Sequence, residues 1–215
     1  MFDRIAPRYD RMNRLMTGRL DQRWRKDQVR RLAIGPGDVV LDLASGTGDL
    51  TEIVLGTGAK AVALDFSRGM LLAGRERQGP GFPFVQGDGN RLPLGDASIT
   101  AVVCGFALRN FTSIPSVFAE LARVLEPGGR MVLLEVDTPR NPLVRWGHGF
   151  YFNRVVPFIG GIISDRQAYQ YLPKSVVYLP PQDELVRMLG DAGFHRIQKQ
   201  RLGMGAAQAL RAVRR

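Results

Sequence analysis

The spacing of apolar positions changes several times along the chain, and each change predicts an element. Between residues 39 and 136, short apolar runs alternate with stretches in which apolar residues recur every three or four positions. Short runs are typical of buried strands, and the wider spacing is typical of amphipathic helices. The predicted strands cover residues 39–44, 61–67, 82–88, 99–108 and 130–136.

Helices are predicted between these strands at residues 48–56, 67–78 and 114–129, and the Pro-Gly-Gly that ends the last of them is expected to stop it. Alternating strands and helices indicate βαβ units, and therefore a mostly parallel sheet with helices on both faces. Several strands end in acidic residues or polar turns. Ligand contacts are therefore expected at the carboxyl ends of the strands.

The two ends of the chain follow other patterns. In residues 1–33, apolar residues at helical spacing predict two short helices broken near Gly18. This segment is either an amphipathic helix that closes the edge of the sheet or a helical flap over a pocket, and its pattern favours neither. After residue 138 the alternation stops, and residues 138–181 are rich in aromatic residues, Pro and Gly. We interpret this stretch as an insertion that serves as a lid or binding loop.

A helix at residues 181–194 and two strands at residues 195–203 and 205–214 are predicted to close the chain. The expected fold is therefore a Rossmann-like α/β domain with a seven-stranded, mostly parallel sheet. We expect residues 1–215 to form this one domain, because 215 residues are enough for one large core and few for two.

Composition and charge narrow the functional classes. One cysteine and two histidines exclude an internal disulfide framework and leave little for a metal site, so no metal is expected. The first residues carry acids and no apolar signal core, and we expect a cytoplasmic protein. The net charge of +10 is dispersed in short basic clusters. A nucleic-acid-binding protein more often shows a concentrated basic stripe with aromatic platforms, so nucleic acid is not expected as a partner.

The candidate chemistry begins at a glycine turn after the first strand of the sheet. Asp42 lies inside this strand, and Gly46 and Gly48 follow it in the pattern D-x-x-x-G-x-G, which lets backbone N–H groups approach a ligand closely. The turn lacks the GK[ST] of a P-loop and the third glycine of a dinucleotide motif. A ligand without a phosphate group is therefore favoured.

Two further acids follow the second and third strands. Asp65 ends the second strand, where an acid can accept both hydroxyls of a ribose, and Asp88 ends the third, where an acid can meet an adenine amino group. Each acid alone could equally be a capping or turn residue. Together the set predicts a nucleoside pocket that fits S-adenosylmethionine, with the amino-acid end of the cofactor at the glycine turn and Asp42. A non-catalytic nucleoside-binding or RNA-binding module is the alternative from another class.

Several longer motifs carry a resemblance to a known family. They are "MFDRIAPRYDRMN", "VLDLASGTGDLT", "LDFSRGML", "FALRNFTSIPSVFAELARVLEPGGR", "YQYLPKSVVYLP" and "ELVRMLGDAGF". Through them nearly the whole chain resembles the quinone-ring C-methyltransferases of menaquinone and ubiquinone biosynthesis. The resemblance implies the class I methyltransferase fold and S-adenosylmethionine-dependent methylation of demethylmenaquinol, or alternatively of the benzoquinol ring of ubiquinone synthesis or of another small apolar molecule.

The resemblance also implies site residues. It places the cofactor at Thr47, Asp65, the pair Asp88–Gly89 and the backbone near Gly105, and the glycine-turn pattern adds Asp42 and Gly46. Gly89 stands where the family more commonly has Ala.

On the reaction side, Arg109 is expected to stabilise a phenolate-like oxygen or to hold a water, with Asn110 beside it. The tyrosines Tyr9, Tyr169 and Tyr171 are expected to line the substrate pocket. Neither His148 nor His195 is assigned as a general base.

The expected substrate is an isoprenoid quinol. The aromatic insertion and the arginine-rich amino end are therefore expected to contact anionic membrane lipid at the inner face of the cell membrane.

Overall fold

The structure is a computed structural model that describes residues 13–79, 83–151, 154 and 179–215. Seven strands form one sheet in the order β3-β2-β1-β4-β5-β7-β6. Their bounds are β1 Val39–Leu43, β2 Lys60–Asp65, β3 Phe84–Gln86, β4 Ile99–Gly105, β5 Leu125–Val136, β6 Phe194–Leu202 and β7 Ala207–Arg214. All neighbouring pairs are parallel except those made by β7, which runs antiparallel to both β5 and β6. The predicted seven-stranded, mostly parallel sheet is confirmed.

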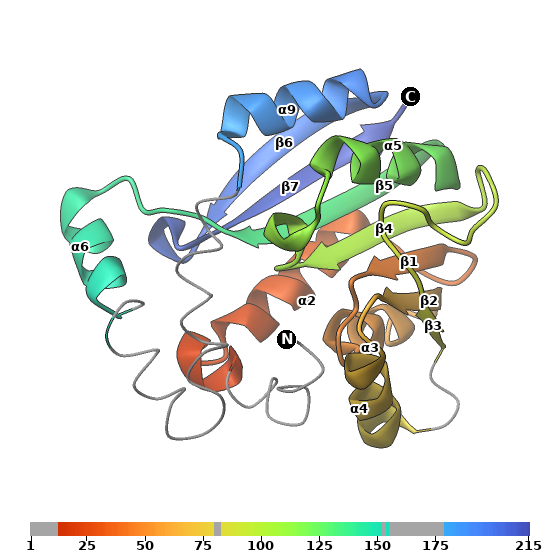
Figure 1. Cartoon of the computed structure of the whole chain (residues 1–215), viewed down its shortest axis with the longest axis horizontal. Helices are drawn as coiled ribbons and strands as arrows, with labels where there is room; N and C mark the ends of the chain where they lie inside the picture. Colours follow the sequence, from red (N-terminus) through yellow and green to blue (C-terminus); the bar gives the residue numbers. More distant parts are fainter. Residues whose placement is uncertain (1–12, 80–82, 152–153, 155–178) are drawn as a thin grey trace.

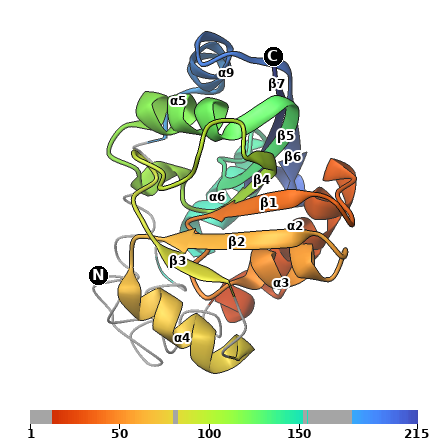
Figure 2. The same cartoon turned by 90° about the vertical axis from the view of Figure 1, so that its right-hand side faces the viewer.

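Helices cover both faces of this sheet (Figures 1 and 2). On one face lie α2 (Leu20–Leu32), α3 (Asp49–Leu55) and α4 (Arg68–Gln78), and on the other lie α5 (Ile114–Val124) and α9 (Gln182–Asp191). Because successive side chains of a strand point to opposite faces, the strands supply two separate cores. Leu41 and Leu43 of β1 pack in the core that contains α5 and α9, whereas Val40 packs in the core of α2 and α3.

The N-terminal helices break where the sequence predicts. Residues 13–17 are helical, and Gly18 and Arg19 then take left-handed φ angles of 56° and 64° before α2 begins. However, α2 does not close the edge of the sheet. It contacts α3, β4 and β5, in the middle of the sheet, and Arg130 of β5 donates to the carbonyl oxygens of Leu32 and Ala33 at its end. The apolar face of α2 is buried against central strands, which an edge position would not provide.

Three predicted boundaries were wrong. Within the described residues, β3 spans only Phe84–Gln86, and β4 ends at Gly105, after which Leu108–Asn110 form the 3-10 helix η1. The helix before β5 ends at Val124, because Leu125 already pairs with Ile99 of β4. The Pro-Gly-Gly segment then lies in an irregularity of β5, between the residues that pair with Ile99 and Ala101. Strand pairing, rather than the breaker residues, sets this boundary.

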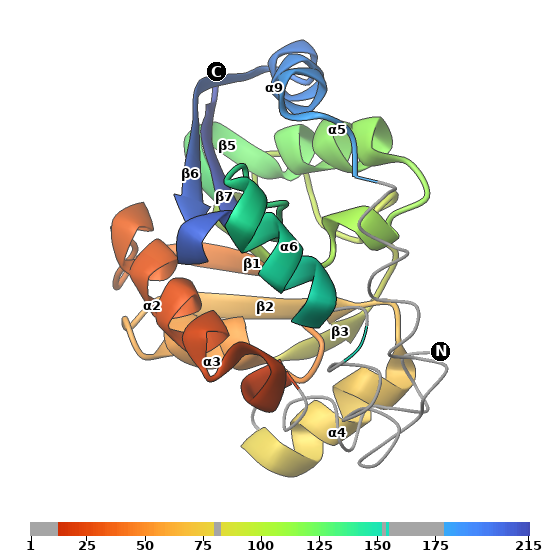
Figure 3. The same ribbon diagram turned by 90° about the vertical axis from the view of Figure 1, so that its left-hand side faces the viewer.

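The predicted insertion contains one described helix. α6 spans Pro142–Phe150 and starts at Asn141, whose side chain accepts hydrogen bonds from the N–H groups of Leu143 and Val144. Figure 3 looks toward the carboxyl ends of β4 and β5 and shows α6 in front of them. Much of the remaining insertion, with Tyr169 and Tyr171, lies outside the described residues, and so does Tyr9. In the part of the chain that is described, no helix is long and apolar enough to cross a bilayer.

Candidate functional site

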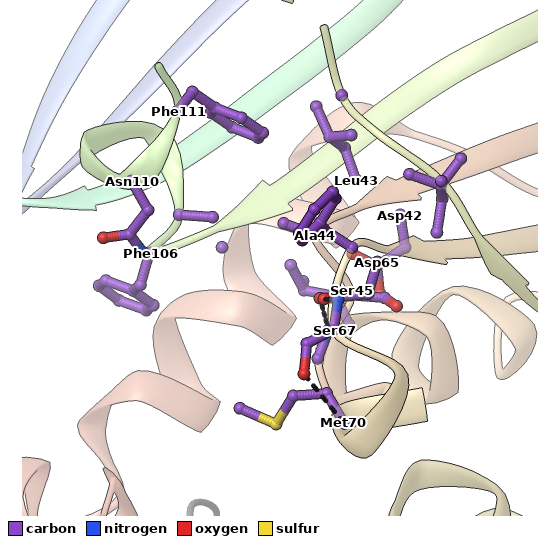
Figure 4. A pocket seen from close by; sticks show the side chains of 18 of the residues that line it. Asp42, Leu43, Ala44, Ser45, Asp65, Ser67, Met70, Phe106, Asn110 and Phe111 are labelled. Atoms are coloured by element: carbon purple, nitrogen blue, oxygen red, sulfur yellow. Dashed lines mark hydrogen bonds between the residues drawn. The ribbon is translucent and has the colours of Figure 1, made fainter. Parts of the chain in front are cut away.

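A pocket of about 330 Å³ opens at the carboxyl ends of β1, β2 and β4 (Figure 4). Its wall comes from the turn after β1, the end of β2, residues 87–90, and residues 105–107 and 110–112 after β4. After β1 the chain winds outward through β2 and β3 and then returns to β4 on the other side of β1. The pocket therefore lies at the point where the strand order reverses, which is where open α/β sheets bind ligands.

Asp65 holds the glycine turn against β2. Its Oδ2 accepts a hydrogen bond from the Gly46 N–H at 2.8 Å, and its Oδ1 accepts one from the Ser67 N–H at 2.8 Å. Gly46 and Gly48 take φ angles of 58° and 89°, which favour glycine, and Ala44 adopts 53° at the same turn. Each carboxylate oxygen of Asp65 has a second acceptor site. The Asp65 carboxylate is therefore a hydrogen-bond acceptor in the wall of the pocket.

Asp42 is a buried carboxyl group at the floor of the pocket. It shares a face of the sheet with Val40 and is 1 % exposed, beside α3. Thr51 Oγ1 of α3 donates to its Oδ2 at 2.6 Å, while no described residue donates to its Oδ1. Burial raises the pKa of Asp42 from 3.8 to about 7, although the Thr51 hydrogen bond opposes the shift. A cationic ligand group would supply the missing partner.

The rim of the pocket carries Asp88, Gly89 and Asn90. The exposed Asp88 carboxylate accepts hydrogen bonds from the backbone N–H and the side-chain amide of Asn90, both at 2.9 Å, and these bonds lower the pKa of Asp88. Gly89 is needed for close packing, since a Cβ at this position would lie 2.7 Å from the Phe111 ring and 3.3 Å from Leu43. Phe111 therefore closes the pocket wall where a larger residue 89 would push it away.

The structure corrects the expected position of Arg109. Its guanidinium is buried outside the pocket lining, where Nη1 lies 2.5 Å from Glu135 Oε1 and 2.7 Å from the Phe106 carbonyl oxygen. The backbone N–H of Arg109 also donates to Glu135 Oε2 at 3.2 Å. Arg109 thus anchors η1 to β5, because a buried carboxylate requires a partner. Asn110 does line the pocket, and no described residue donates a hydrogen bond to its buried Oδ1.

Arg25 is a basic residue of the pocket wall that the sequence analysis did not predict. Arg25 comes from α2, and its guanidinium carbon lies 5.2 Å from the centre of the Phe106 ring. The sequence contains a signal for it, because Arg25 stands four residues after the buried Asp21 and four before the buried Val29, on the inward face of the helix. A charged side chain on the buried face of an amphipathic helix is a candidate functional residue.

The remaining predicted cofactor residues converge on the pocket. Its wall contains Asp42, Gly46, Thr47, Asp65, Asp88, Gly89 and Gly105. Within the described ranges, no group of His, Cys, Asp and Glu side chains is arranged to hold a metal ion. His148 lies on α6 and His195 on β6, and neither belongs to this wall.

The arrangement suits a zwitterionic nucleoside. Besides Asp42 Oδ1 and Asn110 Oδ1, the buried Oγ of Ser45 has no hydrogen-bond partner among the described residues. Buried polar atoms without partners are costly, so their concentration around one cavity indicates a polar ligand. The ligand that this pocket suits is therefore polar, with a positively charged group that can lie beside the Asp42 carboxyl group.

Comparisons with known proteins show the family of the chain. The model of the ubiE/COQ5 methyltransferase family matches residues 1–214. The chain is 41 % identical over 219 residues to a demethylmenaquinone methyltransferase of Roseiflexus castenholzii, covering 100 % of this chain and 92 % of that protein. It is 38 % identical over 215 residues to the ubiquinone/menaquinone biosynthesis C-methyltransferase UbiE of Paracoccus denitrificans, covering 96 % of this chain and 86 % of that protein.

Solved structures show the same fold. A SAM-dependent methyltransferase of Thermotoga maritima superposes with a TM-score of 0.70 at 17 % identity, covering 100 % of this chain and 98 % of that one. At this identity the likeness concerns the fold alone. The class I methyltransferase fold expected from the sequence is therefore confirmed.

Proposed function

The chain belongs to the ubiE/COQ5 methyltransferase family, and we propose that it transfers a methyl group from S-adenosylmethionine to a ring carbon of demethylmenaquinol. It is a methyltransferase of quinone biosynthesis, as its relatives are. The observation that carries the proposal is the convergence of Asp42, Asp65 and Asp88 on one pocket without a phosphate-binding turn. Demethylmenaquinol is favoured over other quinols because several relatives with about 40 % identity bear its name.

The pocket residues divide the cofactor between them. Asp65 binds the ribose hydroxyls, Asp88 and Gly89 border the adenine, and Asp42 and the glycine turn receive the amino-acid end. Bound S-adenosylmethionine supplies an electrophilic methyl group on a sulfonium centre. The main task of the protein is then to orient the ring carbon in line with that methyl group and to exclude water, which together can account for much of the rate enhancement.

Asn110 is the side chain best placed to act on the quinol. Its buried Oδ1 lines the pocket, and it can accept a hydrogen bond from the quinol hydroxyl next to the reacting carbon. Accepting this hydrogen bond polarises the O–H bond and increases the electron density of the ring. Arg109 supports Asn110 indirectly by fixing η1 to Glu135. No described side chain in the wall is assigned as a general base.

A second candidate substrate is the benzoquinol ring of ubiquinone synthesis. It is favoured by the relatives from Paracoccus denitrificans and Geobacter sulfurreducens, whose names include both quinones. The test is to incubate the protein with labelled S-adenosylmethionine and with quinols extracted from a strain that lacks the methylation step. Label in menaquinone supports the main proposal, label in ubiquinone supports the second, and label in neither contradicts both.

An isoprenoid substrate places the enzyme at the inner face of the cell membrane, and α6 carries the surface for this contact. Leu143, Trp146 and Phe150 lie on one side of α6 and are 80 %, 73 % and 55 % exposed, and Arg145 lies beside Trp146. An exposed apolar stripe flanked by arginine is typical of helices that lie in the surface of an anionic bilayer.

The proposed membrane surface on α6 lies near the carboxyl ends of the strands, which is the end of the sheet where the pocket opens (Figure 3). The hydroxyl of Tyr151, directly after α6, donates to the carbonyl oxygen of Met16 at 2.9 Å, which joins the insertion to the N-terminal helical residues. In this proposal the two segments act as lid and flap over the carboxyl ends of the strands. Trp146→Ser should weaken co-sedimentation with anionic vesicles, while the control Leu72→Ser, at an exposed position on α4, should not. Equal binding of both variants would contradict the role of α6.

A further inference from the structure

Arg25 brings a positive charge from α2 to the wall of the pocket. Its side chain is 9 % exposed, and the helix that carries it is held on the sheet by Val29 and Leu32. We propose that Arg25 binds the carboxylate at the amino-acid end of S-adenosylmethionine and thereby selects a cofactor that carries this group. The inference rests on the proposed function, because it presupposes that this cofactor occupies the pocket.

The hydrogen-bonding groups of Arg25 have few partners inside the protein. Its Nε lies 3.7 Å from Asp21 Oδ2, which is an ion-pair distance and too long for a hydrogen bond. This buried Nε has no hydrogen-bond partner among the residues that the structure describes. Asp21 itself accepts a hydrogen bond from Thr17 Oγ1 at 2.6 Å. A buried guanidinium Nε without a hydrogen-bond partner in the described part of the protein indicates an anionic partner from outside the chain.

Asp49, another acid near Arg25, already has three partners of its own among the described side chains. The Asp49 carboxylate forms ion pairs with Arg77 Nη2 at 2.8 Å and Arg14 Nη2 at 3.3 Å, and it accepts a hydrogen bond from Gln22 Nε2 at 2.7 Å. Burial raises the pKa of Asp49, but the charges of Arg25 and Arg77 outweigh it, and the net pKa is lowered. Arg25 thus acts on Asp49 through space without a direct hydrogen bond to it.

The end of β4 is shaped to admit the guanidinium. A Cβ on Gly105 would lie 2.5 Å from Arg25 Nη1, so only glycine allows this approach. Phe106 follows with a left-handed φ of 62°, an unfavourable angle for a bulky residue, and its ring contacts the guanidinium face. The missing Cβ of Gly105 and the left-handed Phe106 therefore both accommodate the observed position of the Arg25 side chain.

Arg25 and Asp42 together match an α-amino acid. Both line the pocket, one with a positive group and one with a carboxyl group whose Oδ1 has no described partner. A carboxylate can take two parallel hydrogen bonds from a guanidinium, and an ammonium can donate to Asp42. The carboxylate of the cofactor therefore belongs at Arg25 and its ammonium group at Asp42.

The test compares two ligands that differ only in the proposed group. Dissociation constants are measured by calorimetry for S-adenosylmethionine and for decarboxylated S-adenosylmethionine, with wild type, Arg25→Met and Arg25→Lys. Arg25→Met keeps an apolar stem against Phe106. It should weaken S-adenosylmethionine about 10- to 100-fold and change the decarboxylated ligand less than about threefold. Arg25→Lys retains the positive charge but lacks the paired N–H donors of the guanidinium. It should lose less affinity for S-adenosylmethionine than Arg25→Met does and should again affect the decarboxylated ligand least.

The control is Arg77→Met, which removes one positive charge near Asp49 from outside the pocket wall and should affect both ligands equally. Equal loss of both ligands in Arg25→Met and Arg25→Lys, or no loss of either, would overturn the carboxylate assignment. Failure of wild type to bind either ligand would instead overturn the proposed function, and with it the inference. If Arg25→Met does not fold, the Arg25→Lys comparison alone decides between these outcomes.

Discussion

Replacing Asp42 by asparagine should make the protein more stable and its cofactor binding weaker. Asparagine has nearly the same shape and can still accept the Thr51 hydrogen bond at its Oδ1. The substitution removes a buried carboxyl group whose pKa is about 7 in the folded protein, because of burial, against 3.8 for an ordinary Asp. It therefore isolates the cost of keeping this charge in the fold.

The magnitude follows from linkage. Between pH 4 and pH 7 the folded protein binds the Asp42 proton more tightly than the unfolded chain, so the free energy of unfolding falls as the pH rises through this window. At 1.36 kcal/mol per pH unit, the difference between 3.8 and about 7 corresponds to roughly 4 kcal/mol at pH 8. Asp42→Asn lacks this penalty. Its melting temperature should exceed that of wild type by about 10 °C at pH 8 and by little at pH 4.5.

Thermal unfolding of both proteins, without ligand, measures this difference at several pH values. Other titrating groups act equally in both proteins and cancel in the comparison. Binding provides the second measurement. In wild type, S-adenosylmethionine should bind more tightly as the pH rises through 7, because the ionised carboxylate attracts its ammonium group. Asp42→Asn should bind more weakly, with an affinity that is nearly independent of pH over this range.

A stability difference that does not grow between pH 4.5 and pH 8 would contradict a raised pKa of Asp42 in the folded protein. Such a result would mean that the Asp42 carboxyl group stays hydrated or finds a partner in the folded protein. A variant that is more stable at pH 8 but binds the cofactor as well as wild type would agree with the raised pKa of Asp42. It would contradict a role of Asp42 in cofactor binding.

Three further outcomes test other parts of the site. Asp65→Ala should raise the dissociation constant of S-adenosylmethionine at least about tenfold, or 1.4 kcal/mol, in calorimetry, and unchanged affinity would remove Asp65 from the ribose site. Arg109→Met should lower the free energy of unfolding by about 3–5 kcal/mol in urea, because it leaves the buried Glu135 carboxylate without its cationic partner. Adding Glu135→Leu should restore most of this stability. If the double variant is no more stable than Arg109→Met, the loss of this ion pair does not explain the destabilisation. Gly89→Ala must displace the Phe111 ring and should weaken cofactor binding more than it lowers the melting temperature, and an unchanged affinity would show that the ring yields freely.

Much of the fold follows from local patterns in the sequence. The alternation of apolar runs and helical spacing predicted the strands and the layers, because both depend on the period of a single element. The break at Gly18 and the turn at Gly46 are also local, since each depends on a left-handed φ that glycine adopts easily. Asp42, Asp65 and Asp88 could be placed together because the carboxyl ends of neighbouring parallel strands share one edge of the sheet.

Other features depend on contacts between distant residues. The pairing of Ile99 with Leu125 began β5 earlier than the glycines suggested. Arg109 was expected at the pocket because it follows a strand there, but Glu135 lies on the same side of the sheet and holds its guanidinium. Nothing local marks that pairing.

The sequence by itself therefore determined the order of the elements, the glycine turn and the edge of the sheet where the pocket opens, because each follows from the geometry of one strand or helix. Only the tertiary structure decided which arginine reaches the pocket. Arg25 enters because α2 crosses the middle of the sheet above Gly105, and Arg109 is withheld by a carboxylate on the neighbouring strand. Such choices depend on how helices and strands pack across long separations in the chain, which the local period of the sequence does not encode.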